Sequence, residues 1–310
     1  MNTPSSAVPG SPLDSQARPP AAMSETRPFY WSVQRELWEN RSIYLAPLAA
    51  AAVFLVGFLI SLIGLPHRMR DILALDPSKQ REVIAMPYDM AAGLIMLITL
   101  VVAAFYCLDA LYGERRDRSI LFWKSLPVSD LTTVLAKASI PIVLLQLICF
   151  AVTFATHLIM LLLSSVVLMG SGIGVTALWT QLAFFPMSLG LLYHLLFLHG
   201  LWYAPFYGWL LLVSSWARRV PILWATLPVL AIGIVEKVAF NTSYFAAMLQ
   251  YRFAGSDDAA MTSATNFPIN PMAHIPALGF LSSPGLWVGL IFAAGFLYAA
   301  ARMRRYREPI

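Results

Sequence analysis

Charged residues are scarce in this sequence. Asp, Glu, Lys and Arg make up only 12% of its 310 residues, about half the share of a typical soluble domain. Hydrophobic residues reach 59%, and the mean hydropathy is +0.69. A chain this apolar cannot cover itself with polar groups in water, so lipid must be the solvent for much of it. The composition therefore excludes a soluble enzyme and a disordered regulator.

Cysteine is also nearly absent, which excludes a disulfide scaffold. The two cysteines, Cys107 and Cys149, both fall within apolar stretches. Their predicted depths differ by more than about 10 Å, so they cannot complete a four-ligand set with His157 and His194. We therefore expect no metal site.

Several catalytic motifs are missing as well. The sequence contains neither H-E-x-x-H nor G-x-S-x-G, the signatures of two hydrolase classes. It also lacks G-x-x-x-x-G-K-[ST], the loop that cradles nucleotide phosphates. The glycines at 170–174 have the wrong spacing for a dinucleotide site, and we expect a turn there. The chain is therefore predicted to have no catalytic residue and no cofactor of its own.

Long stretches without any charge locate the membrane spans. They cover residues 42–67, 90–108, 138–217, 220–235 and 259–301. One crossing needs about 20 residues, so the third stretch must hold more than one. The sequence predicts an all-α polytopic membrane protein with six transmembrane helices. The predicted spans lie near 43–65, 88–111, 134–166, 187–215, 219–236 and 283–302.

The distribution of Lys and Arg predicts the orientation. With six spans, fifteen basic residues fall on the side of both termini and six on the other side. Basic residues concentrate in the cytoplasm, so both termini are expected there. The alternative is seven spans, made by splitting residues 175–217. We interpret the net charge of +5 as a sign of topology and expect no nucleic-acid partner.

Three segments outside the spans have their own character. Residues 1–26 are rich in proline and serine and are predicted to be a disordered cytoplasmic tail. Residues 27–44 repeat aromatic residues at helical spacing among charges, as expected for an amphipathic helix in the membrane interface. The extracytoplasmic segment 237–282 is expected to form short helices before the last span.

The loop 112–133 carries the clearest functional signal. Ile120, Leu121, Phe122 and Trp123, with Leu126, form a short apolar face beside charges. Ser119 is a predicted N-cap, and Pro127 must end the helix. Ser129 or Asp130 is predicted to cap the next helix. Exposed aromatic side chains in cytosol suggest a docking surface for another protein. A helix resting on lipid explains the pattern equally well.

This loop resembles a known family. The stretch GERRDRSILFWKSLPVSD (113–130), with Lys137 seven positions later, is similar to the intracellular loop of bacterial ABC exporter permeases of the type 2 class. Residues 201–237 resemble the fourth and fifth spans of that family. The resemblance implies a six-span half-transporter of the bacterial inner membrane that dimerises above two cytoplasmic ATPase subunits. Those partners would bind ATP and Mg²⁺.

The resemblance also assigns roles by position. In that family the loop holds the coupling helix, which docks into the ATPase. The docking role falls here on Ser119, Ile120, Leu121, Phe122, Trp123, Leu126, Pro127, Val128 and Ser129.

A few polar or aromatic residues inside the spans are candidates for a gate or a translocation path. They are His157, His194, Gln146, Trp202, Tyr203 and Glu236. For the two histidines, packing with a hydrogen bond to a backbone carbonyl or a serine is the simpler interpretation. Anchoring of its span at the membrane surface is the favoured interpretation of Glu236, and packing is the favoured one for the aromatic pair.

Two other function classes remain as alternatives. A secondary transporter driven by an ion gradient usually shows internal repeats, and no repeat between the two halves is visible. An intramembrane enzyme needs convergent catalytic groups, which the missing motifs do not supply.

Overall fold

The computed structural model describes residues 26–124, 128–254, 281 and 283–306, and every regular element in these ranges is a helix. Six helical segments are long and apolar enough to cross a membrane. They are Ser42–Leu73, Pro77–Arg116, Asp130–Gly170, Thr176–Trp202, Pro221–Phe240 and Pro284–Tyr306. The predicted all-α membrane fold with six transmembrane helices is confirmed. The predicted tail and most of the segment 237–282 lie outside the described residues.

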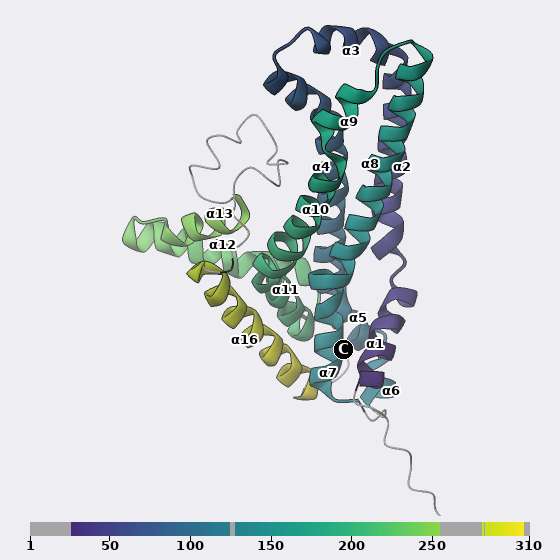
Figure 1. Ribbon diagram of the computed structural model, residues 1–310. Helices are drawn as coiled ribbons and strands as arrows, with labels where there is room; N and C mark the ends of the chain where they lie inside the picture. Colours follow the sequence, from purple (N-terminus) through teal and green to yellow (C-terminus); the bar gives the residue numbers. More distant parts are fainter. Residues whose placement is uncertain (1–25, 125–127, 255–280, 282, 307–310) are drawn as a thin grey trace, which may run out of the picture.

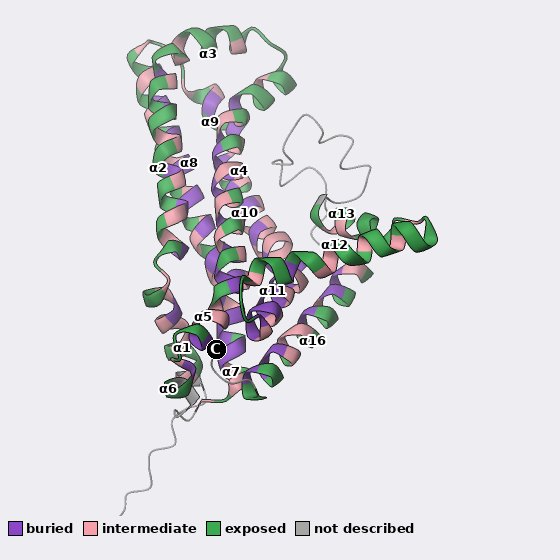
Figure 2. Ribbon diagram, turned by 180° about the vertical axis from the view of Figure 1, so that it is seen from behind, coloured by how far each residue is buried: buried purple, intermediate pink, exposed green. Residues whose placement is uncertain are grey.

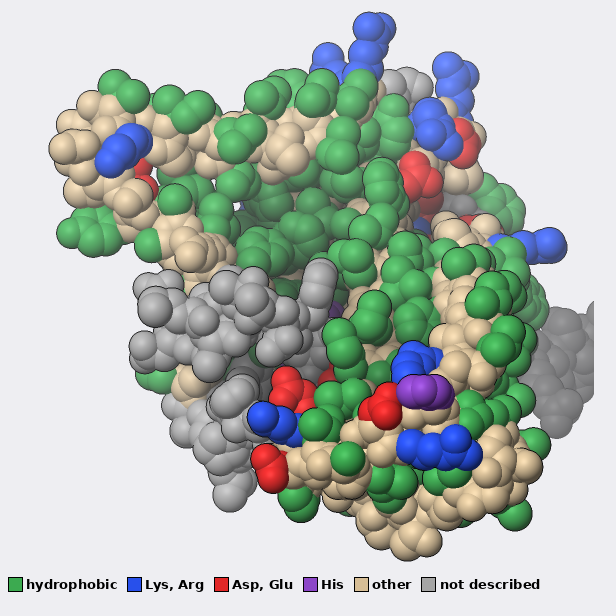
Figure 3. Space-filling model, turned by 90° about the horizontal axis from the view of Figure 1, so that it is seen from above, with side chains coloured by type: hydrophobic (Ala, Val, Ile, Leu, Met, Phe, Trp, Pro, Cys, Tyr) green, Lys and Arg blue, Asp and Glu red, His purple; other side chains and the backbone are tan. Residues whose placement is uncertain are grey.

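Three tall helices, α2 (Ser42–Ser61), α4 (Pro77–Ala110) and α8 (Leu145–Gly170), stand side by side (Figure 1). With 34 residues, α4 is about 51 Å long, well beyond the roughly 30 Å of hydrocarbon in a bilayer. It therefore extends past the apolar layer. A 3-10 turn (Leu62–Gly64) and α3 (Leu65–Leu73) lead from α2 to the far end of the bundle. Figure 3 views that end, where charged side chains lie among apolar ones.

The N-terminal helix α1 (Thr26–Glu39) packs against α7 (Asp130–Ser139). It ends before α2 begins, so the predicted interfacial helix 27–44 is shorter than expected. Its aromatic side chains Tyr30, Trp31 and Trp38 are exposed, whereas Glu36 is buried. The large aromatic side chains of this helix thus face away from the bundle, whereas Glu36 faces inward and Val33 and Leu37 pack against the core.

The predicted fourth span, 187–215, is not one continuous helix. A short α9 (Thr176–Leu182) leads into α10 (Phe184–Tyr193), which runs into a π-helix (His194–Trp202). The chain then breaks at Tyr203, and α11 (Ala204–Trp216) begins with Pro205 in its first turn. Proline lacks a backbone donor and fits the start of a helix, which explains the break. Because α11 is only about 20 Å long, it does not supply a seventh crossing.

The π-helix His194–Trp202 lies close to a second π-helical stretch. Residues Ile140–Leu144 form a π-helical stretch between α7 and α8, with Pro141 in its first turn. A Cβ atom at Gly200 would lie 2.5 Å from the carbonyl oxygen of Ile142. A side chain at this position would therefore force the two helices apart, so glycine sets their spacing.

The C-terminal helix α16 (Pro284–Tyr306) packs along α11. In contrast, α12 (Pro221–Phe240) and α13 (Tyr244–Ala254) project sideways from the bundle, crosswise to the tall helices (Figure 1). Ala225 is the one buried residue of α12, and the rest of this helix is largely exposed (Figure 2). An apolar helix with so little burial suits contact with lipid or with another protein. α13 is a short helix in the segment where one was predicted.

Candidate functional site

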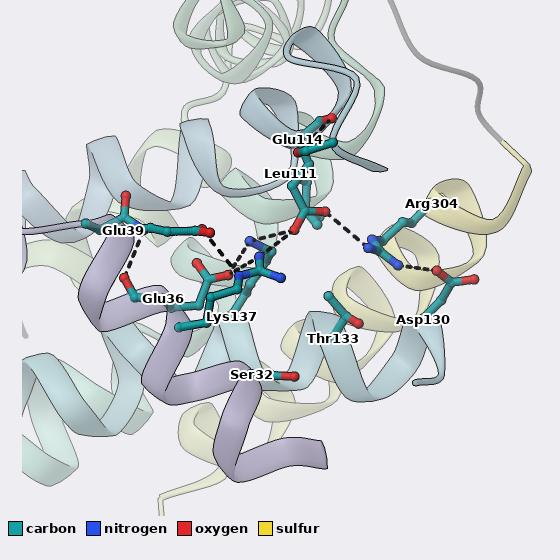
Figure 4. A network of polar contacts seen from close by, with 12 residues as sticks. Ser32, Glu36, Glu39, Leu111, Glu114, Asp130, Thr133, Lys137 and Arg304 are labelled. Carbon is teal, nitrogen blue, oxygen red and sulfur yellow. Dashed lines mark hydrogen bonds and ion pairs between the residues drawn. The ribbon is translucent and has the colours of Figure 1, made fainter. Parts of the chain in front are cut away.

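A buried network of charged side chains joins four helices at the end of the bundle that holds α1, α7 and the C-terminal end of α16 (Figure 4). The Lys137 ammonium lies 2.7 Å from a carboxylate oxygen of Glu36 and 3.2 Å from one of Glu114. The other oxygen of Glu114 lies 3.1 Å from Arg304 Nη2. All four residues are less than a tenth exposed. Residues from α1, α5 (Tyr112–Arg116), α7 and α16 thus meet in one cluster.

Three further residues complete this network. Arg35 donates through Nη2 to both Glu36 and Glu114, at 2.9 Å each. The Tyr106 hydroxyl donates to Glu36 at 2.9 Å, and Arg304 Nη1 donates to Asp130. These contacts join three acids to three bases, and the more exposed Glu39 adds a fourth acid at the edge, 3.3 Å from Arg35 Nε. Removing one partner of such a buried pair typically costs about 3–5 kcal/mol, since the other charge is left uncompensated.

Local sequence explains where these charges stand. Ser129 is the N-cap of α7, and its hydroxyl accepts from the Thr132 backbone N–H at 3.0 Å, as predicted. Asp130 therefore occupies the first helical position of α7, where a negative charge is favourable. Arg304 lies in the last turn of α16, where a positive charge is favourable.

The first part of the loop 112–133 is attached to the end of α11. The Ser214 hydroxyl accepts from the backbone N–H groups of Leu111 and Tyr112, at 3.0 and 2.9 Å. Arg115 Nη1 donates to the carbonyl oxygens of Ser215 and Ala217, at 2.9 and 3.1 Å. These bonds satisfy backbone groups that helix ends leave without partners. The loop and α11 are therefore joined at two adjacent points.

The short helix predicted in this loop forms as α6 (Ile120–Lys124), next to α1 and α7 (Figure 1). Arg118 precedes it with φ of 57°, a left-handed conformation that reverses the chain. Ile120 is 1% exposed, whereas Leu121 and Phe122 are 60% and 61% exposed. Among the described side chains of this helix, Ile120 therefore packs into the bundle, whereas Leu121 and Phe122 are exposed.

The remaining predicted docking residues are only partly described. The Ser119 hydroxyl lies 3.4 Å from the Glu114 carbonyl oxygen, to which it donates. Val128 is partly buried and Ser129 is exposed. The Trp123 side chain, Leu126 and Pro127 lie outside the described residues.

Two of the predicted path residues are buried in α8. His157 Nε2 lies 2.9 Å from the Tyr88 carbonyl oxygen, so the predicted hydrogen bond to a backbone carbonyl is confirmed. Gln146 donates to the Pro141 carbonyl oxygen at 2.9 Å and so bonds to the π-helical stretch that precedes α8. The His194 ring lies beside that of His199, with centroids 5.1 Å apart.

The other predicted path residues contact α13. Trp202 Nε1 donates to the Arg252 carbonyl oxygen at 2.8 Å. The Tyr203 hydroxyl donates to the Phe253 carbonyl oxygen at 3.3 Å. Glu236 accepts from the backbone N–H groups of Tyr244 and Phe245, at 2.6 and 2.8 Å. It thus caps the start of α13. The six path candidates do not converge on one place.

Sequence reasoning missed most of the charged network. Lys137 is part of the family resemblance, but no partner is predicted from the sequence for Glu36, Lys137 or Arg304, although opposite charges at the ends of several spans are a signal for pairing. A surface contact lies near the network, where Arg116 Nη1 is 3.8 Å from a carboxylate oxygen of Asp109. Asp89, which is partly buried in α4 just before the uncharged stretch 90–108, was also overlooked.

Within the described residues, no group of three His, Cys, Asp or Glu side chains is arranged to hold a metal ion. Cys107 and Cys149 are buried free thiols. Comparisons of this chain with protein-family models, with curated proteins and with solved structures find no match.

Proposed function

We propose that this protein is the membrane subunit of an ATP-driven exporter of the bacterial cytoplasmic membrane, and that α6 docks into a separate cytoplasmic ATPase. The observation that carries the proposal is the exposure of α6. It presents Leu121 and Phe122, each about three-fifths exposed, on a helix fixed by the fully buried Ile120. Apolar side chains presented among charges at the end of a bundle are typical of a protein interface.

The surroundings of α6 suit the transmission of a movement. The loop that carries it is bonded to α11 through Ser214 and Arg115. Glu114 in the same loop is paired with Lys137 of α7 and Arg304 of α16. A displacement of α6 would therefore pull on several spans together, because buried ion pairs resist separation.

The energy source in this proposal is a partner. Because the sequence has no phosphate-binding loop, ATP and Mg²⁺ are assigned to the ATPase subunit. A second copy or a paralogue of this chain, set in lipid, completes the assembly, and the largely exposed α12 offers it apolar surface. ATP binding would close the ATPases, move α6 and tilt the spans, so that a substrate leaves on the far side.

The docking assignment is tested by a double substitution, Leu121→Asp with Phe122→Asp. The variant is purified from native membranes, and an associated ATPase is identified by mass spectrometry through a peptide containing G-x-x-x-x-G-K-[ST]. We expect the wild type to carry this subunit, with ATP hydrolysis that vanadate inhibits, and the variant to lose both. Tyr306→Asp is the matched control, because Tyr306 is an exposed aromatic residue at the same end, on α16.

Retention of the ATPase by the double variant would refute docking through α6. A separate transport assay tests the secondary-transporter alternative. If the isolated chain in liposomes moved solute under an ion gradient without any ATPase, the proposed energy source would be wrong.

A further inference from the structure

Arg252 holds an unusual position at the end of α16 away from the charged network. Its guanidinium carbon lies 4.2 Å from the centre of the Trp202 ring, within the range of a cation–π contact. Its Nη1 donates to the Gly285 carbonyl oxygen at 2.9 Å. The Trp202 indole N–H in turn donates to the Arg252 carbonyl oxygen. Residues of α13, the π-helix and α16 therefore enclose one guanidinium group.

Two glycines on one face of α16 make room for this arrangement. A Cβ atom at Gly289 would overlap Arg252 Nη2, and a Cβ atom at Gly285 would lie 3.4 Å from the Trp202 ring. Residues four positions apart lie above one another on a helix. The first turns of α16 thus form a shallow cradle for the ring and the guanidinium.

Among the residues that the structure describes, none places an anion beside this charge. Arg252 forms no ion pair with any described residue, and its Nη2 is buried without a hydrogen-bond partner there. Burial lowers the pKa of Arg252, because the charged form loses hydration, yet an arginine remains protonated in proteins. The N-terminal end of α16 is itself positive and cannot balance the charge. A partly buried cation of this kind requires an anion.

The level of Arg252 along the bundle indicates where such an anion comes from. Gly285 and Arg304 are 19 residues apart on α16, about 28 Å along its axis. The hydrocarbon layer is about 30 Å thick. Because α16 is inclined to the tall helices (Figure 1), Arg252 lies less than this distance from the level of Arg304, on the side of the opposite membrane surface.

We propose that Arg252, held by Trp202 and the first turns of α16, binds an oxyanion at this level. The ligand is a phosphate or carboxylate group, presented by a lipid headgroup or by a soluble molecule that reaches the same place. Guanidinium groups bind these anions through paired hydrogen bonds, and Nη2, which packs against Gly289, has no hydrogen-bond partner among the described residues. The inference concerns the permease chain alone and does not depend on the ATPase.

The test measures lipid binding by native mass spectrometry of the purified full-length chain. Phosphatidylglycerol is titrated against the wild type, Arg252→Gln and Gly289→Ala, with phosphatidylcholine as the uncharged reference lipid. We expect about tenfold weaker phosphatidylglycerol binding for Arg252→Gln, which loses the charge. Gly289→Ala keeps the charge but displaces Nη2, and we expect weaker phosphatidylglycerol binding for this variant as well. Arg70→Gln is the control, because Arg70 is an exposed arginine on α3 at the other end from the network.

A second arm separates the two sources of the anion. Inorganic phosphate that competes with phosphatidylglycerol indicates a site open to soluble oxyanions, whereas no competition indicates a lipid site. If Arg252→Gln does not fold, as judged by thermal unfolding, Arg252→Lys replaces it, since it keeps the charge without the planar fork. Equal phosphatidylglycerol affinity of the Arg252 variant, the Arg70 control and the wild type would overturn the proposal.

Discussion

Lys137→Met is the sharpest perturbation of the charged network. Methionine has a similar volume to lysine but carries no charge, so the substitution leaves the packing and removes one cation. Lys137 lies 2.7 Å from Glu36 and 3.2 Å from Glu114, and its side chain is 3% exposed. Both carboxylates would remain buried with one cation fewer. We expect the free energy of unfolding to fall by about 3–5 kcal/mol, since uncompensated buried charges cost this much.

The assay is thermal unfolding of the detergent-purified protein. For a chain of this size, 1 kcal/mol corresponds to roughly 2–4 °C in Tm, so the expected decrease is on the order of 10 °C. Lys137→Arg keeps the charge, so its Tm should decrease much less. The double variant Glu36→Gln with Lys137→Met removes an acid together with the base. It should recover part of the stability, which is the signature of direct coupling.

A matched surface pair serves as the control. Arg116→Gln breaks the contact with Asp109, whose side chain is 60% exposed, and exposed pairs contribute less than about 1 kcal/mol. If Lys137→Met lowered Tm no more than Arg116→Gln does, the network would not stabilise the fold, and the reasoning from burial would be refuted.

Three further predictions concern local contacts, each measured by thermal unfolding unless stated otherwise. Gly200→Ala places a methyl group against the Ile142 carbonyl and should cost about 1–3 kcal/mol, whereas Gly233→Ala, with open space around it, should have little effect or stabilise α12 slightly. Equal Tm values for the two would contradict the close helix crossing. Ser129→Ala removes the N-cap of α7 and should cost about 1 kcal/mol, which Ser129→Asp should largely preserve. Ser214→Ala leaves two backbone N–H groups without their acceptor and should lower the free energy of unfolding by about 1–3 kcal/mol. In the proposed complex it should also lower transport more than ATP hydrolysis. An equal loss of both activities would count against transmission through α11.

The six-span fold was predictable from the positions of charged residues. Lipid excludes charge so strongly that stretches such as 42–67 and 138–217 mark the crossings without any knowledge of packing. The break in the fourth span was not predicted. Pro205 is compatible with the start of a helix, but the π-helix before it contacts the distant stretch 140–144 at Gly200. Such contacts leave no periodic signal in the sequence.

The candidate site was predictable in part. The short apolar run 120–123 and the flanking Pro127 indicated a helix, and Ser129 indicated the next cap, because these features depend on neighbours in sequence. The charged network was missed because Glu36 and Lys137 are 101 positions apart. Their pairing depends on how α1 packs against α7, which amphipathicity alone does not determine. The hydrogen bonds from the loop to Ser214 were missed for the same reason, because they too depend on how distant segments pack.

The central claim, that α6 docks into a separate ATPase, is tested most directly by photo-crosslinking in native membranes. A photoreactive phenylalanine analogue replaces Leu121, which is 60% exposed, and in a parallel sample Leu131, which is 47% exposed on α7. The account predicts an adduct between residue 121 and a protein that carries a nucleotide-binding loop, lost when both α6 side chains are replaced by aspartate. An adduct of residue 121 with lipid alone, in a protein that still transports, would contradict it.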